Sequence, residues 1–224
     1  MVQAIKHAAD TWDVDIISMS FGFKDSSEKV SKAINLAKHR TRNGVPRPVL
    51  FYAAASNNNH LDYNPIAYPA RDARLVTAVF SLDGHGDKSE FSPKGNQHSL
   101  TNLAFLGQGL EAAFSEKLST GGLRHDYRLM SGTSCSTPLA AGTAALVLEL
   151  LRRKDIRENI PEKLVPKLIT ADGMNKIFEW MLKENAQRGA GVYLEIQPWH
   201  LLRGMEQGNI QVGDLSYRLK DGAL

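Results

Sequence analysis

One stretch of the sequence decides the fold of this chain: it reads Ser131-Gly132-Thr133-Ser134-Cys135-Ser136-Thr137-Pro138-Leu139-Ala140-Ala141-Gly142. Glycine adopts backbone angles that other residues avoid, so Gly132 suits a sharp turn ahead of an exposed hydroxyl. Pro138 suits a first helical turn, where the N–H that proline lacks would have no partner. The stretch therefore predicts a turn that presents Ser134 at the start of a helix.

The predicted helix continues through residues 139–151, which are nearly all apolar and often small. Such a helix is expected to be buried on all sides and to lie close against a sheet. These residues are too few to cross a bilayer. Unpaired N–H groups at the start of the helix would favour negative charge developing beside Ser134. A serine becomes a nucleophile only beside a base, which is usually a histidine that a carboxylate orients.

Taken alone, Gly-Thr-Ser is explained as well by a helix cap, because Ser and Thr are favoured there. The match here is much longer. Position for position, Gly-Thr-Ser-x-Ser-x-Pro-x-x-Ala-Gly resembles the nucleophile signature of the subtilisin-like serine peptidases, the subtilases. By this resemblance Ser134 is the nucleophile. Cys135, directly after it, stands where the family is variable and is not expected to be a second nucleophile.

Residues 14–22 resemble the subtilase strand that ends in a Ser-Leu-Gly type turn. In that family this edge lines the specificity pocket and pairs with the substrate backbone. The resemblance thus assigns substrate binding to Ser20, Phe21 and Gly22. Without the family, β-branched and apolar residues that end in glycine predict a buried strand.

Residues 49–57 resemble the subtilase strand that leads to the oxyanion-hole asparagine. The resemblance implies that the side-chain N–H of Asn57 donates to the oxyanion of a tetrahedral intermediate. The family often has glycine where Ser56 stands, and two more asparagines follow Asn57 directly. Alone, this segment is also typical of a polar loop after a strand, because Asn is common in turns.

Between these strands the apolar residues recur with helical spacing, over residues 1–12 and 28–42, and Asn43-Gly44 then supplies a stop signal. A further helix over 172–187 and a short strand over 192–196 follow the serine helix. Alternation of strand and helix predicts an α/β fold of three layers, with a mostly parallel sheet between helices, as in subtilisins. We expect one domain over 1–224, matched best over 1–152 and closed by 153–224.

Composition excludes several other classes. With 224 residues, 42% hydrophobic and 23% charged, the chain has ordinary globular character. A net charge of +3 is too small to predict nucleic-acid binding. One cysteine, Cys135, allows no internal disulfide and favours a reducing compartment, so a cytoplasmic location is expected. We expect no metal site, cofactor or membrane partner, and the sequence shows neither a signal peptide nor a metal-spaced Cys/His cluster.

The base that Ser134 needs is missing. Subtilases carry their triad in the order Asp, His, Ser, but neither the Asp-Thr/Ser-Gly motif nor the His-Gly motif of the family stands upstream of residues 14–22. His85 falls in a turn-like stretch, and His60 and His125 are each better explained as surface loop residues than as the base.

Three functions remain open. The first is a serine endopeptidase module that acts through an acyl-enzyme on Ser134, with the Asp and His of the triad supplied by an upstream half. On this reading the chain is an incomplete domain with an exposed apolar edge. It is then expected to be inactive alone and to fold poorly. The partners are a peptide or protein substrate and the missing half. The alternative is an inactive pseudopeptidase that serves binding or regulation. A third, an α/β-hydrolase, is weaker, because its elbow motif requires a second glycine.

Overall fold

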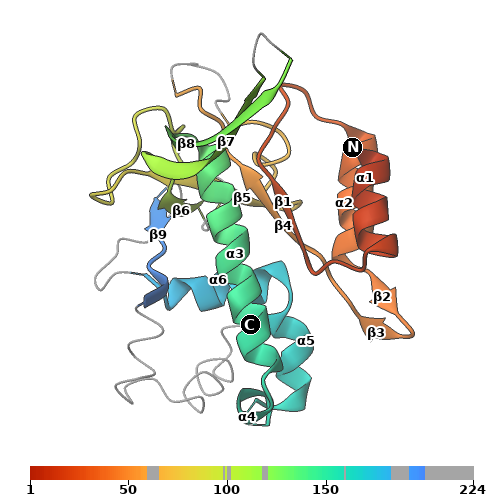
Figure 1. The fold of residues 1–224 in the computed structure, drawn as a ribbon. Coiled ribbons are helices and arrows are strands. Elements are labelled where there is room, and N and C mark those ends of the chain that lie inside the picture. Colours follow the sequence, from red (N-terminus) through yellow and green to blue (C-terminus); the bar gives the residue numbers. More distant parts are fainter. Residues whose placement is uncertain are drawn as a thin grey trace.

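The computed structural model describes residues 1–59, 66–97, 99, 102–117, 121–158, 160–182 and 192–199. Within these residues the main sheet has five strands in the order β1-β4-β5-β6-β9, and every neighbouring pair is parallel. Their bounds are β1 Ile16–Met19, β4 Leu50–Ala54, β5 Thr77–Leu82, β6 Asn102–Leu106 and β9 Tyr193–Glu195. Helices cover both faces of this sheet (Figure 1), so the predicted three-layer α/β fold is confirmed.

The layer on one face is built around α3 (Thr133–Arg152), which packs across β1, β4, β5 and β6. Shorter helices close the same side: α4 Lys154–Arg157, the 3-10 turn Glu162–Leu164, α5 Val165–Leu168 and α6 Ala171–Glu179. Successive strand residues point to opposite faces, so Leu50 and Tyr52 of β4 pack into this core and Phe51 and Ala53 into the other. The predicted closing helix and the short strand after it are present as α6 and β9, but the expected helix end at 187 was wrong: α6 ends at Glu179, and residues 180–182 are not helical. Residues 183–191 lie outside the described part.

The opposite face is covered by α1 (Val2–Lys6), its π-helical continuation His7–Thr11, and α2 (Glu28–Lys38). The four apolar residues predicted to share one face of α2 are all buried: Val30, Ala33, Ile34 and Ala37. The expected helix end at 42 was wrong. Asn43 and Gly44, with φ of 52° and 77°, instead form the turn between β2 (Thr41–Arg42) and β3 (Val45–Pro46), because two positive φ angles suit a two-residue hairpin.

One side of α3 faces solvent, so the expectation of burial on all sides was wrong. Leu139 is 42% exposed and Leu146 is 73% exposed, and residues seven apart lie on the same side of a helix. The helix also begins earlier than the apolar run suggested. By length and composition alone, its twenty residues are enough to cross a bilayer, although here they pack on the sheet of an α/β domain.

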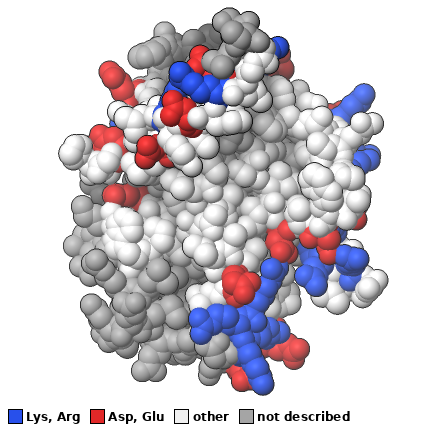
Figure 2. All heavy atoms as spheres, in the orientation of Figure 1, with Lys and Arg blue, Asp and Glu red and all other residues white. Residues whose placement is uncertain are grey.

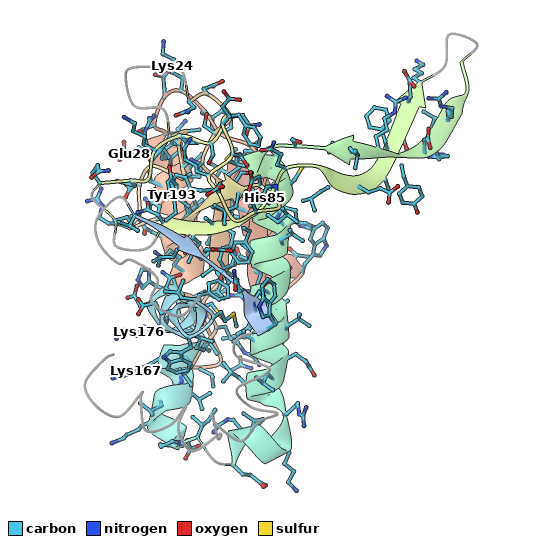
Figure 3. All side chains as sticks on the ribbon, turned by 90° about the vertical axis from the view of Figure 1, so that its left-hand side faces the viewer. Lys24, Glu28, His85, Lys167, Lys176 and Tyr193 are labelled. Atoms are coloured by element: carbon cyan, nitrogen blue, oxygen red, sulfur yellow. The ribbon has the colours of Figure 1, made fainter. Side chains whose placement is uncertain are left out.

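The sequence did not predict a two-stranded antiparallel ribbon, β7 (Leu110–Lys117) and β8 (Leu123–Met130), which leads directly into the Ser134 turn. Figure 3 shows these two strands reaching away from the body of the molecule.

Candidate active site

The candidate site lies where the carboxyl ends of the parallel strands meet the start of α3. Ser20 follows β1, Asn57 follows β4, and both contact the Gly132–Ser134 turn. Loops at the carboxyl ends of parallel strands are the usual place for ligands in open α/β sheets. Three residues that the sequence singled out, far apart along the chain, are thus brought together.

Ser134 is exposed and is the second residue of α3. Its Oγ donates a hydrogen bond to the carbonyl oxygen of Ser20 at 3.2 Å. Its backbone N–H belongs to the first helical turn, where amides have no acceptor within the helix. The hydroxyl of Ser134 and its own backbone N–H, which has no acceptor within the helix, therefore lie side by side at the positive end of a twenty-residue helix.

Pro138 ties this turn to strand β1. The sequence placed it in the first helical turn, but α3 begins at Thr133, so Pro138 lies within the helix. A residue at that position would normally donate its N–H to the carbonyl of Ser134, four residues earlier, and proline cannot. The freed carbonyl instead accepts a hydrogen bond from Ser20 Oγ at 2.9 Å. The first turn of α3 is thus fastened to the end of β1.

The side chain of Asn57 is oriented by Thr133. Asn57 Oδ1 accepts hydrogen bonds from the backbone N–H of Thr133 at 2.8 Å and from Thr133 Oγ1 at 3.1 Å. Because Oδ1 accepts these two hydrogen bonds, the amide nitrogen Nδ2 faces Gly132. If Gly132 carried a Cβ atom, that atom would lie 2.9 Å from Asn57 Nδ2. Gly132, whose φ is 154°, leaves room for an amide donor beside the start of α3.

Ser56 has a φ of 143°, which residues with a side chain rarely adopt. This is the position at which the sequence departs from the glycine of the resembling family. The backbone N–H of Ser56 points to Thr133 Oγ1 at 3.3 Å, and Ser56 Oγ accepts from the N–H of Asn58 at 3.1 Å. The unusual backbone angle thus lies directly before the amide that Thr133 orients.

Ser20, Phe21 and Gly22 form an exposed stretch beyond β1. Phe21 is 45% exposed, and its ring lies 6.0 Å from that of Phe23. Gly22 is required by packing, because a Cβ there would come within 2.5 Å of the Ala67 side chain. Of these three predicted substrate-binding residues, Ser20 contacts Ser134 directly.

Gly107 is a site residue that the sequence reading did not single out. Its N–H donates to the carbonyl of Leu82, and its own carbonyl accepts from the N–H of Gly132 at 2.8 Å. A Cβ at Gly107 would lie 2.0 Å from Ser136 Oγ. Glycine here lets the end of β6 approach the first turn of α3. The signal in the sequence that could have indicated it is the pair of glycines, Gly107 and Gly109.

Among the described histidines, at 7, 39, 85 and 125, none hydrogen-bonds to Ser134. His125 lies on the exposed face of the ribbon and pairs with Ser115 Oγ at 2.8 Å, and His85 lies in the exposed turn that follows β5, labelled in Figure 3. His60 is outside the described residues. Burial raises the pKa of the Cys135 thiol, which disfavours a reactive thiolate beside Ser134. Over the described part of the chain, no group of three His, Cys, Asp or Glu residues is placed to hold a metal ion.

A family model described as the subtilase family matches residues 1–175. That match covers most of the chain, so the chain belongs to the subtilase family of serine peptidases. The sequence is 25% identical over 207 residues to the subtilisin-like protease het-Q2 of Podospora anserina, covering 90% of this chain and 52% of that protein. It is 29% identical over 174 residues to an intracellular serine protease of Paenibacillus polymyxa, covering 75% of this chain and 46% of that protein. The chain thus spans about half the length of these relatives.

Solved structures agree in fold. The prenylagaramide maturation protease PagA superposes with a TM-score of 0.63 at 22% identity, covering 90% of this chain and 66% of that one. The patellamide maturation protease PatA gives a TM-score of 0.58 at 24% identity, covering 91% and 68%. These likenesses support the subtilisin-like arrangement of the sheet and its helices.

Proposed function

We propose that this chain is the nucleophile-bearing part of a serine endopeptidase that hydrolyses peptide bonds through an acyl-enzyme on Ser134. The observation that supports this most is the pairing of Ser134 with an oriented Asn57. The serine hydroxyl is exposed at the start of α3, and Thr133 holds the asparagine so that its amide nitrogen is available as a donor.

In the proposed reaction Ser134 Oγ attacks the scissile carbonyl carbon while a histidine takes its proton. The oxygen that becomes negative accepts hydrogen bonds from Asn57 Nδ2 and from the backbone N–H of Ser134. The histidine then protonates the leaving amine, and water releases the acyl group by the reverse sequence. Ser20, Phe21 and Gly22 would hold the substrate strand on the acyl side. This chemistry requires no cofactor.

The histidine and its orienting aspartate would come from a segment that adds to the free edge of β1. Among the described strands, β1 pairs with β4 only. Beside it a cavity of about 490 Å³ is lined mainly by apolar side chains, among them Ile17, Phe21 and the 69% exposed Trp12. Figure 2 shows that the centre of the face bearing α3 and β1 carries almost no charged side chains. A strand and a helix packed there would cover this apolar surface.

A fluorophosphonate probe tests the proposal, because it labels only an activated serine. We expect no labelling of this chain alone, and labelling of Ser134 when the chain is co-expressed with the polypeptide encoded directly upstream, provided that it carries Asp-Thr/Ser-Gly and His-Gly motifs. Ser134→Ala should abolish the signal. Labelling of the isolated chain would contradict the proposed source of the base.

A second candidate function, a pseudopeptidase that binds without cleaving, is favoured by one observation: no described histidine hydrogen-bonds to Ser134, whose Oγ instead donates a hydrogen bond to the carbonyl of Ser20. The fluorophosphonate experiment also distinguishes these two candidate functions. A stop codon directly upstream, or an assembled protein that binds peptides without reacting with the probe, would support the second.

A further inference from the structure

The β7–β8 ribbon has two unlike faces. On one, Phe114 packs under the guanidinium of Arg128, at 4.2 Å from ring centroid to Cζ, and Glu116 accepts from Arg128 at 2.6 Å and from Arg124 at 3.3 Å. The register places Leu123, Tyr127 and Leu129 together on the other face. These three side chains are 63%, 69% and 76% exposed.

An isolated two-stranded ribbon is only marginally stable in water. In this one the charged side chains of the first face pair with each other. On the second face Ser115 and His125 hydrogen-bond to each other at 2.8 Å, whereas Leu123, Tyr127 and Leu129 stay exposed. The three apolar residues, which we call the ribbon stripe, are therefore available to a partner, and large exposed apolar groups in line are typical of binding surfaces.

The position of the ribbon indicates what that partner is. Its strands begin and end at the site: Gly109 N–H donates to Ser131 Oγ at 3.0 Å, and Gly132 N–H donates to the Gly107 carbonyl. Ser20 follows β1, whereas Gly107 follows β6, and β4 and β5 lie between these strands. With neighbouring strands about 4.8 Å apart, three intervals separate the two ends by roughly 14 Å. The Gly132–Ser134 turn spans this interval, because Ser134 hydrogen-bonds to Ser20 and Gly132 hydrogen-bonds to Gly107. The base of the ribbon, at Gly109 and Ser131, thus lies at the other end of this turn from Ser20–Gly22.

We propose that the ribbon stripe binds the polypeptide substrate beyond the scissile bond, on the leaving-group side, and selects long chains that carry apolar residues there. This rests on the proposed function, in which Ser20–Gly22 hold the acyl side. From Met130 to Leu123 the ribbon extends seven residues, or roughly 24 Å at about 3.4 Å each. An extended substrate therefore needs about seven residues after the cleaved bond to cover it. The preferred substrates are unfolded proteins and long peptides rather than short ones.

The test uses Ser134→Ala, so that binding is measured without cleavage, in the assembled protein. Two fluorescein-labelled peptides share the same residues up to the scissile bond; one ends two residues after it, and the other continues for ten residues with Leu and Tyr at alternating positions. Fluorescence anisotropy gives the Kd of each. We expect the long peptide to bind at least tenfold more tightly, and the combined change Leu123→Ser, Tyr127→Ser and Leu129→Ser to remove that advantage while leaving the short peptide unchanged.

The control carries Glu111→Ser and Lys117→Ser, which alter polar residues on the same ribbon face; it should retain the advantage. Equal binding of both peptides by the protein with an unaltered ribbon would overturn the inference. It would also be overturned if the only effect of the three serine substitutions were the loss of a dimer in sedimentation velocity, because the ribbon stripe would then bind a second copy of the chain.

Cleavage of peptides, measured with Ser134 intact, is a separate readout. Length-independent cleavage keeps the proposed function and rejects this inference, whereas stripe-dependent binding without cleavage keeps the inference and rejects the proposed function.

Discussion

Ser56 carries a side chain at a backbone angle, φ of 143°, that glycine adopts more readily. A residue held in such a region costs on the order of 1–3 kcal/mol, which the surrounding structure must supply. Here the surroundings are the hydrogen bonds around Thr133, which also orient the Asn57 amide. The strain therefore lies one residue away from the proposed oxyanion donor.

Replacing Ser56 with glycine should stabilise the chain. Release of the strain outweighs the roughly 0.5–1 kcal/mol of added chain entropy that glycine brings, so we expect the free energy of unfolding to rise by about 1 kcal/mol. Urea denaturation followed by circular dichroism measures the change. Ser27→Gly is the matched control: Ser27 has a φ of −129° and makes no capping bond through its side chain, so its change should cost a few tenths of a kcal/mol. A Ser56→Gly variant no more stable than the original would show that Ser56 is unstrained.

At this scale the resemblance of three short segments to a known family singled out Ser134, Asn57 and Ser20, and the structure brings these residues together. The role of each residue stays a prediction. The sequence could not predict that Thr133 would orient Asn57, since residues 76 apart must first be brought together by the sheet. The sequence does not predict the role of Gly107 for the same reason: a Cβ is excluded there only because Ser136 packs against it in the fold.

Among the elements, α3 has an unusual first turn. Pro138 removes one helical hydrogen bond and Ser20 replaces it from the end of β1. Helix propensity alone would favour alanine at position 138 by about 3 kcal/mol. The proline thus exchanges a bond within the helix for one between helix and strand.

A double-mutant cycle tests this exchange. Ser20→Ala should cost about 0.5–1 kcal/mol of stability in the original chain, because the Ser134 carbonyl loses its donor. In a Pro138→Ala background the new N–H can bond to that carbonyl, so the same change should cost much less, giving a coupling energy of about 0.5 kcal/mol. Ser18→Ala changes an exposed serine within β1 itself and should show no coupling. Equal costs of Ser20→Ala in both backgrounds would contradict the exchange.

Helices and buried strands followed from the sequence because apolar periodicity is strong where one face meets a core. The β7–β8 ribbon could not be predicted in this way. Its apolar residues alternate with charged residues that pair across the two strands, so the sequence pattern resembles that of a solvated loop. Arg128 and Glu116 become partners only in the observed strand register. The burial of α3 was overestimated because composition does not say which side the sheet covers.

The whole molecule leaves a broad apolar surface beside β1, in keeping with a chain that spans about half the length of its relatives. Exposed apolar groups of this kind promote association of the isolated chain. On α3 the contrast is sharp: Leu146 is 73% exposed, whereas Leu148, two residues on, is 4% exposed.

Leu146→Ser should therefore reduce association of the isolated chain without lowering its stability. We expect less light scattering at equal concentration and a free energy of unfolding, from urea denaturation, within about 0.5 kcal/mol of the original, as is usual for surface substitutions. Leu148→Ser, at a buried position, should instead destabilise the fold by about 2–5 kcal/mol. Unchanged scattering in the Leu146 variant would show that this side of α3 does not mediate association.

The bond between Ser20 and the Ser134 carbonyl has a mechanical consequence. It works as a tether between the strand end that would grip a substrate and the turn that carries the nucleophile. Under the proposed function, a chain bound along Ser20–Gly22 that displaced this strand end would therefore also displace the turn that carries Ser134. The missing N–H of Pro138 leaves the Ser134 carbonyl free to make this link.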